Sequence, residues 1–546
     1  MKHDPSSTRT WRLLNLSRGL EESEQELRLR ACRKAGVSPD RLRGFRIARQ
    51  SLDARRLRGE ILFRCQVDLI LPAATSTPAM RRAQKAGKLR EAPKPAALEL
   101  EGLPASVRKT RVVVVGAGPG GLFAAVTLAR NGARVTVIDR GDPIPLRGRS
   151  IVAMHRYRRH DPESNLLFGE GGAGTYSDGK LYTRVDDPLE VLLLEELVAC
   201  GAQQTILYDA RAHIGTDRLH RVIPALRERL RTQGVEFHWR ARMEGLAVDD
   251  GPPKQVRAVK TSGGELPCDA VLVAVGHSAR DSWSVLASHG VLFESRPFQF
   301  GVRVEHPQSL IDRARFGTGK ERELLGAASY NLVMKQSGDD PGAHSFCMCP
   351  GGRIVASISD PGHLCTNGTS NSRHSSKFAT AAIVTTVRPA DWAPFGDGPF
   401  AGVAFQRHFE KLFFDAGGGD YTAPSQRVPD FLSGRLSEGE LRTSYLLGAR
   451  PERIDELLPP RVRDALRKAL LQFDQNIPDF AGPEGLLIGV ESRSSGPVRI
   501  PRDRETARAV GFSNLYPVGE GAGHAGGIMS AALDGANSAR ALLRTV

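Results

Sequence analysis

The sequence contains few cysteines, few aromatic residues and no long apolar run. Seven cysteines in 546 residues are too few for a disulfide framework, and the odd number also favours a reducing compartment. No Cys/His group has the spacing of a structural zinc site, so no metal centre is expected. No stretch of about 18 uncharged apolar residues occurs, and the first residues lack the apolar core of a secretory signal. We therefore expect a cytoplasmic protein without a membrane span.

The charge is unevenly distributed along the chain. The net charge is +15, and residues 1–108 contain 23 Lys and Arg against 12 Asp and Glu, which leaves the other 438 residues with only +4. A basic excess of this kind can mark a partner that carries phosphate, so RNA is one candidate partner. The simpler interpretation, which we favour, is a solvated surface rich in arginine.

The strongest local pattern lies at residues 111–139. A run of β-branched residues precedes a glycine cluster, a helix-like segment and a second apolar run that ends in Asp139. Gly116, Gly118 and Gly121 have the G-x-G-x-x-G spacing, which allows a tight turn, close approach of a pyrophosphate, and close packing of the helix on the strand. The N-terminal end of the helix would bind phosphates, and Asp139 would bind the hydroxyls of a ribose. A dinucleotide site is predicted; a purely structural glycine turn is the alternative.

Two further segments are rich in glycine. Residues 165–184 contain five glycines within eleven residues, with Phe and Tyr among them. This composition predicts a cofactor or substrate loop, and a flexible surface loop is the alternative. Near the C-terminus, NLYPVGEGAGHAGG and the apolar run behind it again have the order strand, glycine-rich turn, helix. No second complete fingerprint precedes residue 297, so a separate NAD(P) domain is not predicted.

Five motifs resemble those of a bacterial and plastid family of uncharacterised FAD-dependent dehydrogenases: FGEGGAGTYSDGKL, HIGTD, SFCMCPGG, GVESRSSGPVRI and YPVGEGAGHAGGIMSAALDG. The resemblance covers about residues 40–546. It implies a two-dinucleotide-type flavoprotein with FAD as cofactor and an unidentified small-molecule substrate. Because no dedicated NAD(P) domain is predicted, either NAD(P)H binds transiently as electron donor or another electron acceptor is used. One residue departs from the expected pattern, since His524 stands where we expect a tyrosine beside the flavin.

The resemblance also implies roles for the C-terminal motif. Gly519 and Glu520 resemble a Gly-Asp pair whose carboxylate accepts hydrogen bonds from the ribityl hydroxyls. The helix that starts near Gly526 and Gly527 would direct its positive end at the flavin N1–C2=O region. The complete set of expected cofactor-binding residues is Gly116, Gly118, Pro119, Gly120, Gly121, Asp139, Arg140, Arg147, Gly171, Gly172, Thr175, Met243, Gly276, Gly519, Glu520, Gly526, Gly527 and Ile528.

Three residues are candidates for catalysis. Cys347, with Cys349 in the segment CMCPGG, would need a lowered thiol pKa for redox or covalent chemistry, and two small strand residues are the alternative. Glu491 could move protons. Arg493 could hold an anionic substrate or stabilise reduced flavin, and a local ion pair is the alternative.

These expectations define the fold class as α/β. A Rossmann-like FAD/NAD(P)-binding domain would carry an inserted α+β substrate domain and a small N-terminal α+β module. The expected boundaries are 1–70 for the basic module, 71–108 for a linker, 109–296 and 486–546 for the FAD-binding domain, and 297–485 for the substrate domain.

The predicted function is an FAD-dependent oxidoreductase that transfers a hydride between its substrate and flavin N5. An RNA-acting flavoprotein anchored by the basic module, and an FAD-binding scaffold or sensor without turnover, are the alternatives. His277 is expected to be a turn residue, and Asn367 and Arg373 are expected to line the substrate cavity. The pattern does not indicate an oligomeric state.

Overall fold

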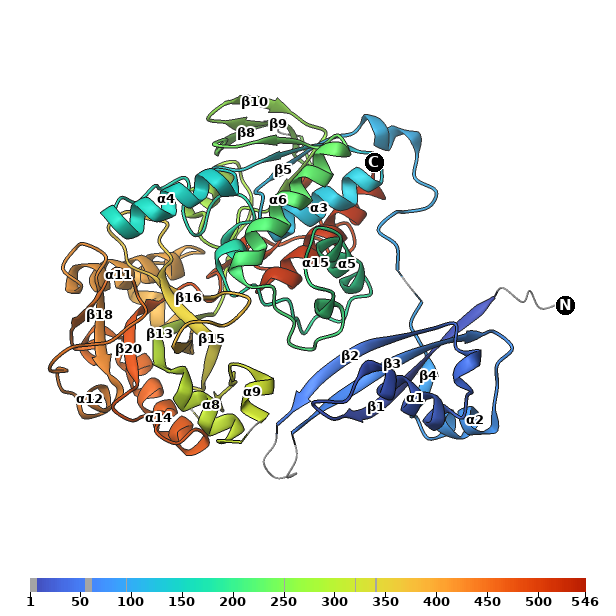
Figure 1. Ribbon diagram of the computed structural model, residues 1–546. Helices are drawn as coiled ribbons and strands as arrows, with labels where there is room; N and C mark the ends of the chain where they lie inside the picture. The colour runs from blue at the N-terminus through green and yellow to red at the C-terminus, as the bar shows by residue number, and fades with distance from the viewer. Residues whose placement is uncertain (1–6, 55–60, 95, 250, 320, 339–340) are drawn as a thin grey trace. The chain divides into compact units, whose positions relative to one another are not determined.

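The computed structural model describes residues 7–54, 61–94, 96–249, 251–319, 321–338 and 341–546. The chain forms two compact units, each considered by itself (Figure 1). The first consists of Met1–Ala96, Gln203–His213 and Phe316–Gly326, and the second of Ala97–Ala202, Ile214–Arg315 and Ala327–Val546. None of the helices in the described ranges combines the length and the apolar character needed to cross a bilayer.

The first unit is a four-stranded antiparallel sheet with two helices packed on one face (Figure 1). Leu27 and Ala31 of one helix and Met80 of the other join Leu13 and Val67 of the sheet in one apolar core. The order of elements is that of a ferredoxin-like split motif, with strands ordered β2-β3-β1-β4. The elements are β1 (Thr8–Arg18), α1 (Glu24–Ala35), β2 (Gly44–Asp53), β3 (Leu62–Pro72), α2 (Pro78–Lys85), β4 (Leu89–Glu91) and α9 (Glu321–Leu325).

The linker expected at 71–108 is interrupted by regular structure. Helix α2 begins after Thr77, whose hydroxyl accepts a hydrogen bond from the Met80 N–H, and β4 pairs with β1 through Arg90 and Arg12. Eight helical residues and three strand residues are too short to give a measurable period in the sequence. The fold of the N-terminal module therefore continues past residue 70.

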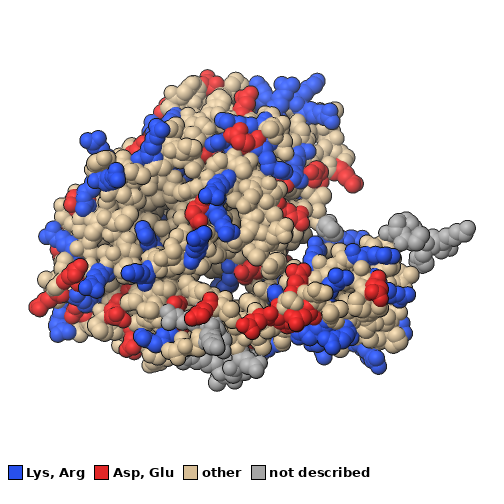
Figure 2. Space-filling model, viewed as in Figure 1, with Lys and Arg blue, Asp and Glu red and all other residues tan. Residues whose placement is uncertain are grey.

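Part of the basic excess of this unit is used within the unit. Asp68 is fully buried beneath the open face of the sheet and forms ion pairs with Arg12 at 2.7 Å and Arg46 at 2.9 Å. On the face of the molecule seen in Figure 2, Asp and Glu side chains lie among the Lys and Arg side chains. Both observations agree with a solvated arginine-rich surface.

The second unit is built on a five-stranded parallel sheet in the order β22-β11-β5-β6-β7. The βαβ unit predicted at 111–139 is present, and α3 packs beside α15 (Figure 1). A separate three-stranded sheet has the order β10-β9-β8. The elements of these layers are β5 (Arg111–Val115), α3 (Pro119–Arg130), β6 (Arg134–Ile138), α4 (Ile144–Tyr157), α5 (Glu190–Ala199), α6 (Thr216–Thr232), β7 (Glu236–His238), β8 (Met243–Asp249), β9 (Gln255–Thr261), β10 (Gly264–Pro267), β11 (Ala270–Val273), α7 (Arg280–Ser288), β22 (Leu515–Pro517) and α15 (Ile528–Leu543).

A second large sheet, eight-stranded and mainly antiparallel, occupies the region between β11 and β22 in the chain. We expected residues 486–491 in the FAD-binding domain, but they form β20, which pairs with β13 at the centre of this sheet. The short strands β12 (Glu294–Ser295) and β21 (Val498–Arg499) pair with each other where the chain enters and leaves the eight-stranded sheet. Its elements are β13 (Phe298–Pro307), α8 (Gln308–Phe316), β14 (Val333–Met334), β15 (Ala343–Ala356), β16 (Thr366–Ser370), β17 (Phe378–Val387), α10 (Pro389–Trp392), α11 (Ala401–Ala416), β18 (Ala423–Arg427), α12 (Val428–Ser433), β19 (Ala449–Pro451), α13 (Ile454–Leu457), α14 (Pro460–Asn476) and β20 (Leu486–Glu491).

Candidate functional site

A cleft lies at the carboxyl ends of the parallel strands, where open α/β sheets bind their ligands. Its open volume, including the part continuous with solvent, is about 940 Å³. Among the residues expected to bind the cofactor, those that line this cleft are Gly116, Gly118, Pro119, Gly120, Asp139, Arg140, Gly172, Met243, Gly276, Gly519, Glu520, Gly527 and Ile528.

The first glycine turn has two glycines that the protein itself requires. Gly116 has φ of 106°, and a Cβ there would lie 2.3 Å from the carbonyl oxygen of Ala274. A Cβ on Gly121 would lie 1.9 Å from the carbonyl oxygen of Gly116. Gly118 differs, because the nearest protein atom to a Cβ there is the Gly172 Cα at 3.8 Å. The protein's own packing therefore explains glycine at 116 and 121, whereas Gly118 leaves room on the cleft side.

The glycine-rich loop is attached to this turn through its backbone. The Gly171 N–H donates to the Ala117 carbonyl at 2.8 Å, and a Cβ on Gly172 would lie 3.1 Å from the Gly118 Cα. Leu167 and Phe168 of the loop line the cleft. The loop is therefore a wall of the cleft, which the sequence interpretation had favoured over a flexible surface loop.

Three residues expected at the cofactor lie behind this loop. Arg147 of α4 is fully buried and donates from Nε to the Asn165 carbonyl at 2.7 Å and from Nη1 to the Glu170 carbonyl at 2.6 Å. The Thr175 hydroxyl donates to the same Glu170 carbonyl at 3.2 Å. Arg147 and Thr175 do not line the cleft, and neither does Gly171. Their polar groups hold the loop in shape, because a glycine-rich loop has few side chains with which to fix itself.

Asp139 and Arg140 follow β6 at the edge of the cleft. Both Asp139 carboxylate oxygens accept backbone hydrogen bonds at 2.8 Å, one from Ala117 and one from Gly141. Asp139 therefore fixes the first glycine turn, and only the second lone pair of each oxygen remains for a ligand hydroxyl.

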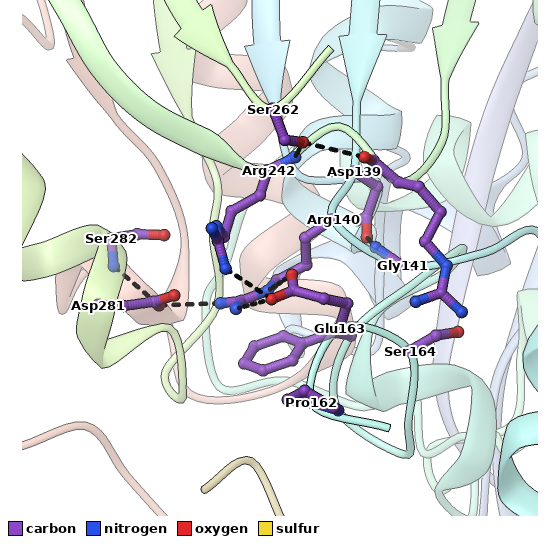
Figure 3. A network of polar contacts seen from close by, with 12 residues as sticks. Asp139, Arg140, Gly141, Pro162, Glu163, Ser164, Arg242, Ser262, Asp281 and Ser282 are labelled. Carbon is purple, nitrogen blue, oxygen red and sulfur yellow. Dashed lines mark hydrogen bonds and ion pairs between the residues drawn. The ribbon is translucent and has the colours of Figure 1, made fainter. Parts of the chain in front are cut away.

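Arg140 belongs to a network of charges beside the cleft (Figure 3). Its guanidinium forms two hydrogen bonds with Glu163, at 2.9 and 3.1 Å, and one with Asp281 at 2.8 Å. Arg242 also donates to Glu163, at 2.7 Å. The Arg140 guanidinium carbon lies 4.3 Å from the centre of the Phe168 ring. Since Arg140, Phe168 and Arg242 all line the cleft, this network fixes one of its walls.

The C-terminal motif forms the opposite wall. The Gly519 N–H, just after β22, donates to Asp534 of α15 at 2.7 Å. A Cβ on Gly535 would lie 2.0 Å from the Gly120 carbonyl oxygen, so α3 and α15 touch through their backbones. This contact brings the N-terminal ends of both helices to the cleft, where Pro119 and Ile528 line it.

Glu520 and His277 face one another across the inner end of the cleft. The Glu520 carboxylate and His277 Nδ1 are 3.9 Å apart. Burial raises the pKa of Glu520 to about 7. Burial, together with the positive charges of Arg493 and Arg280, lowers the pKa of His277 to about 4. At neutral pH His277 is therefore neutral, and Glu520 is poised between its two protonation states. His277, expected only as a turn residue, lines the cleft.

Arg493 does not face the cleft. It forms a two-pronged ion pair with the fully buried Glu410 of α11, at 2.9 and 2.7 Å. Arg280 of α7 binds the same carboxylate at 2.9 and 3.0 Å. Arg493 is thus part of a buried ion-pair cluster that joins α7 to α11. Both terminal nitrogens of Arg493 are occupied by protein partners, Ser359 and Glu410, which favours the alternative of a local ion pair; a role for Arg493 at the substrate or the flavin stays a prediction.

Cys347 and Glu491 belong to a third group of charges. Glu491 Oε2 lies 3.6 Å from Nη1 of the fully buried Arg303, and burial raises the pKa of Glu491 to about 7. Arg303 also donates to the Cys347 carbonyl at 3.4 Å. Cys347, partly exposed, and the buried Cys349 lie beside Lys180. We call Cys347, Cys349, Lys180, Arg303 and Glu491 the thiol cluster.

The remaining candidates lie outside the cleft lining. The His524 ring is 3.0 Å from the Ile500 carbonyl through Nε2. Asn367 Oδ1 accepts from the Gly368 N–H at 2.7 Å, and Arg373 is exposed. Gly526 is likewise exposed, and its N–H donates to the Ser530 hydroxyl at 3.1 Å.

The sequence interpretation missed several residues of the site. Lys180 was passed over as part of a glycine-rich loop, and Arg303 is one basic residue in an alternating strand. Glu163 and Arg242 come from two irregular segments. A local signal existed only for Lys180, which follows a glycine in the motif SDGKL. Arg303, Glu163 and Arg242 have no such signal, and only the folded chain brings them to their places.

Matches to family models cover most of the chain. Residues 114–173 match the NAD(P)-binding Rossmann-like domain, residues 191–297 match the pyridine nucleotide-disulphide oxidoreductase, and residues 297–494 match the C-terminal domain-like region of FAD-dependent proteins. Residues 11–70 match a domain of unknown function. An uncharacterised protein of Clostridium beijerinckii is 37% identical over 528 residues, which are 96% of this chain and 97% of that protein.

Two solved structures show a distant likeness. Glycine oxidase from Bacillus cereus has 10% identity and a TM-score of 0.34, with 80% of this chain and 95% of that chain covered. L-proline dehydrogenase from P. horikoshii has 12% identity and a TM-score of 0.33, with 79% and 92% covered. At these scores neither likeness carries an argument about this chain.

The parallel sheet, the two glycine-marked helix ends and the family matches define an FAD-dependent oxidoreductase of unidentified substrate. The chain belongs to the same family of uncharacterised FAD-dependent proteins as its Clostridium beijerinckii relative. The fold class, the FAD cofactor and the oxidoreductase activity expected from the sequence are thereby confirmed, and nothing in the comparisons supports action on RNA.

Proposed function

We propose that FAD lies along the cleft with its pyrophosphate at the N-terminal end of α3 and its flavin N1–C2=O region at the N-terminal end of α15. The observation that carries the proposal is the convergence of these two ends, neither of which is capped by a side chain. Free N–H groups and the positive end of a helix dipole favour negative charge, on the phosphate oxygens at α3 and on the reduced flavin at α15. The absence of a side chain at Gly118 and Gly527 leaves room for FAD at both helix ends, because a Cβ on Gly118 would meet only the Gly172 Cα, at 3.8 Å, and a Cβ on Gly527 would have no protein atom within 4 Å.

The two ends of the cleft differ in chemistry, which supports an orientation. Arg140, Phe168 and Met243 offer cationic, aromatic and apolar surface suited to the adenosine half. Glu520 and His277 offer a carboxylate and a neutral imidazole suited to the ribityl chain and the ring system. The bound flavin would supply the site that accepts or donates a hydride.

The protein's own groups would assist that transfer. Glu520 can accept hydrogen bonds from hydroxyls, and at a pKa of about 7 it can also hold or release a proton. The helix dipole of α15 favours negative charge at its N-terminal end. The substrate would approach from the second sheet, where Cys347 and Glu491 lie. NAD(P)H would act as a transient donor, because only one complete dinucleotide fingerprint is present. The seven free cysteines support a cytoplasmic location.

The binding site is tested with one substitution and a matched control. Gly118→Val should abolish FAD binding, because the added side chain would occupy the place of the pyrophosphate. Gly251→Val is the control, since a Cβ there meets no atom within 4 Å and Gly251 lies outside the cleft. Released FAD per chain is measured by fluorescence. Equal FAD content in the two folded variants would refute the proposed position of the pyrophosphate.

The activity is tested by anaerobic reduction. With FAD bound, NADH and NADPH are added in turn, and bleaching of the flavin absorption is followed. Rapid bleaching with either identifies the donor. A flavin that stays oxidised with both and is reduced only by dithionite would refute NAD(P)H as the donor.

A further inference from the structure

The two cysteines of the thiol cluster are brought together by a distortion of β15. The pairing of β15 with β17 shifts register between Phe346 and Cys349, and Cys347 has φ of 43°, a left-handed conformation that non-glycine residues adopt rarely. Cys349 Sγ lies 3.3 Å from the Cys347 carbonyl oxygen and is hydrogen-bonded to the Cys347 sulfur. The strand therefore folds back so that both thiols point to the same side.

Two cations flank these thiols. Lys180 Nζ lies 3.8 Å from Cys349 Sγ and 2.5 Å from Asp178. Arg303 is fully buried, and its nearest carboxylate, Glu491, is 3.6 Å away. A Cβ on Gly368 would lie 2.2 Å from Arg303 Nη2 and 3.0 Å from Cys349 Sγ. Glycine at this position thus makes room for the guanidinium beside the sulfur.

This arrangement favours one thiolate. The hydrogen bond from Cys349, and then the charges of Lys180 and Arg303, lower the pKa of Cys347 against the effect of burial. Hydrogen bonding to Cys347 and burial raise the pKa of Cys349. One sulfur is therefore a nucleophile and its neighbour a protonated thiol, which is the asymmetry that thiol–disulfide exchange requires.

Two short segments of the chain connect the cysteine pair and its neighbours with the cleft. The glycine-rich loop runs from Gly172, which lines the cleft, to Lys180. A second segment runs from Glu491 to Gly496, where a Cβ would lie 3.5 Å from the Glu520 carbonyl oxygen and 3.8 Å from the His277 Cβ. The charge of Cys347 is also close enough to raise the pKa of Glu520. The thiols are not part of the cleft lining, but the segment 491–496 connects their cluster with Glu520 and His277, at the end of the cleft proposed for the flavin ring.

We propose that Cys347 and Cys349 form a redox-active dithiol that exchanges two electrons with the flavin. This inference rests on the proposed position of FAD. From the Cys347 thiolate and the Cys349 thiol, a sulfur–sulfur bond forms and the S–H bond of Cys349 breaks. Two electrons and the Cys349 proton pass to oxidised FAD, which becomes the reduced anion. The reverse step uses reduced FAD to cleave the disulfide.

The dithiol is tested on the full-length protein with FAD bound. The protein is equilibrated anaerobically at a series of ratios of reduced to oxidised glutathione, quenched in acid, alkylated and digested. We expect the peptide with residues 347–349 to pass, in one step, from two alkyl labels to an unlabelled form lighter by two hydrogens. Cys347→Ser should leave one label at every ratio unless glutathione itself is attached. Two labels at every ratio would overturn the proposal.

Cys365 provides a matched control. It is buried in the same unit, and burial raises the pKa of its thiol to about 11. Cys365→Ser should leave the titration of residues 347–349 unchanged. If Cys365→Ser shifted that titration as much as Cys349→Ser does, the assignment of Cys347 and Cys349 as the reacting pair would be overturned.

The link to the flavin has a separate readout. With oxidised FAD and the reduced dithiol, we expect an absorption band beyond the flavin's own, caused by the thiolate, that is lost in Cys347→Ser and kept in Cys365→Ser. Absence of the band from wild-type protein that binds FAD and forms the disulfide would overturn the exchange with flavin. A chain that binds no FAD but still forms the disulfide would instead refute the proposed function.

Discussion

Removing the charge of Glu410 should lower the free energy of unfolding of the second unit more than any single surface substitution does. The carboxylate is fully buried and binds two guanidinium groups, each through two hydrogen bonds, and also the Ser492 hydroxyl at 2.6 Å. Asp360, which is a quarter exposed, is the other acid at Arg280. Glu410→Gln keeps the shape of the side chain, but it leaves the buried guanidinium groups of Arg280 and Arg493 with Asp360 as the one remaining acid. Breaking a buried ion pair in this way costs about 3–5 kcal/mol.

The assay is urea unfolding followed by tryptophan fluorescence, since Trp283 lies on α7 three residues from Arg280 and is fully buried. Asp415→Asn is the matched control: it lies on the same helix, and its ion pair with Lys411 is about half exposed on both sides. That substitution should cost less than about 1 kcal/mol. Equal losses in the two variants would refute the argument that the buried cluster stabilises this unit.

The pH dependence gives a second check on Glu410. Arg280 and Arg493 hold the pKa of Glu410 well below its ordinary value despite burial, which opposes ionisation. A carboxyl with a depressed folded pKa contributes stability above its unfolded pKa, about 4.3, and loses it as the pH falls toward the folded value. The difference between wild type and Glu410→Gln should therefore be full above about pH 5 and shrink below pH 4.

Three further outcomes are expected. Gly121→Ala should destabilise the protein by about 1–3 kcal/mol in urea unfolding, because its Cβ would lie 1.9 Å from the Gly116 carbonyl oxygen; an unchanged midpoint would contradict this packing. Glu520→Gln should gain stability over wild type without FAD as the pH rises from about 4.3 to 7, by up to about 3 kcal/mol, because the raised pKa of Glu520 makes its ionisation unfavourable in the folded state; a pH-independent difference would exclude Glu520 as the titrating group. Lys180→Met should slow iodoacetamide labelling of Cys347 at pH 7 and move its pH profile upward, even with Arg303, Asp178, Glu491 and Cys349 still facing the thiol; an unmoved profile would remove Lys180 as the thiolate's partner.

The parts of the site that could be predicted from sequence are those with a local pattern. Gly116, Gly118 and Gly121 lie within six residues of one another, and each has a backbone reason to be glycine or a place on the cleft. The C-terminal motif has the same strand, turn and helix order, so Gly519 and Ile528 were also placed at the cleft.

The contacts that could not be predicted from the sequence are those with partners far away in the chain. Arg147 and Arg493 look alike in sequence as cations near a motif, but one binds backbone carbonyls of the glycine-rich loop and the other binds Glu410 of α11. The thiol cluster joins residues of the glycine-rich loop, β13, β15 and β20, and no window of sequence contains them. Similarly, β20 reads as a strand, but only its pairing with β13 shows which sheet it joins.

The contact of Gly120 with Gly535 has a consequence for how the protein is made. One helix of the proposed FAD site, α3, emerges from the ribosome long before its partner, α15. Until β22 has added to the edge of β11 and α15 has followed, the Gly120 carbonyl lacks its contact with Gly535 and the cleft lacks the wall that these elements form. The FAD site can therefore be completed only after α15 has been synthesised, and until then the parallel sheet keeps an open edge at β11.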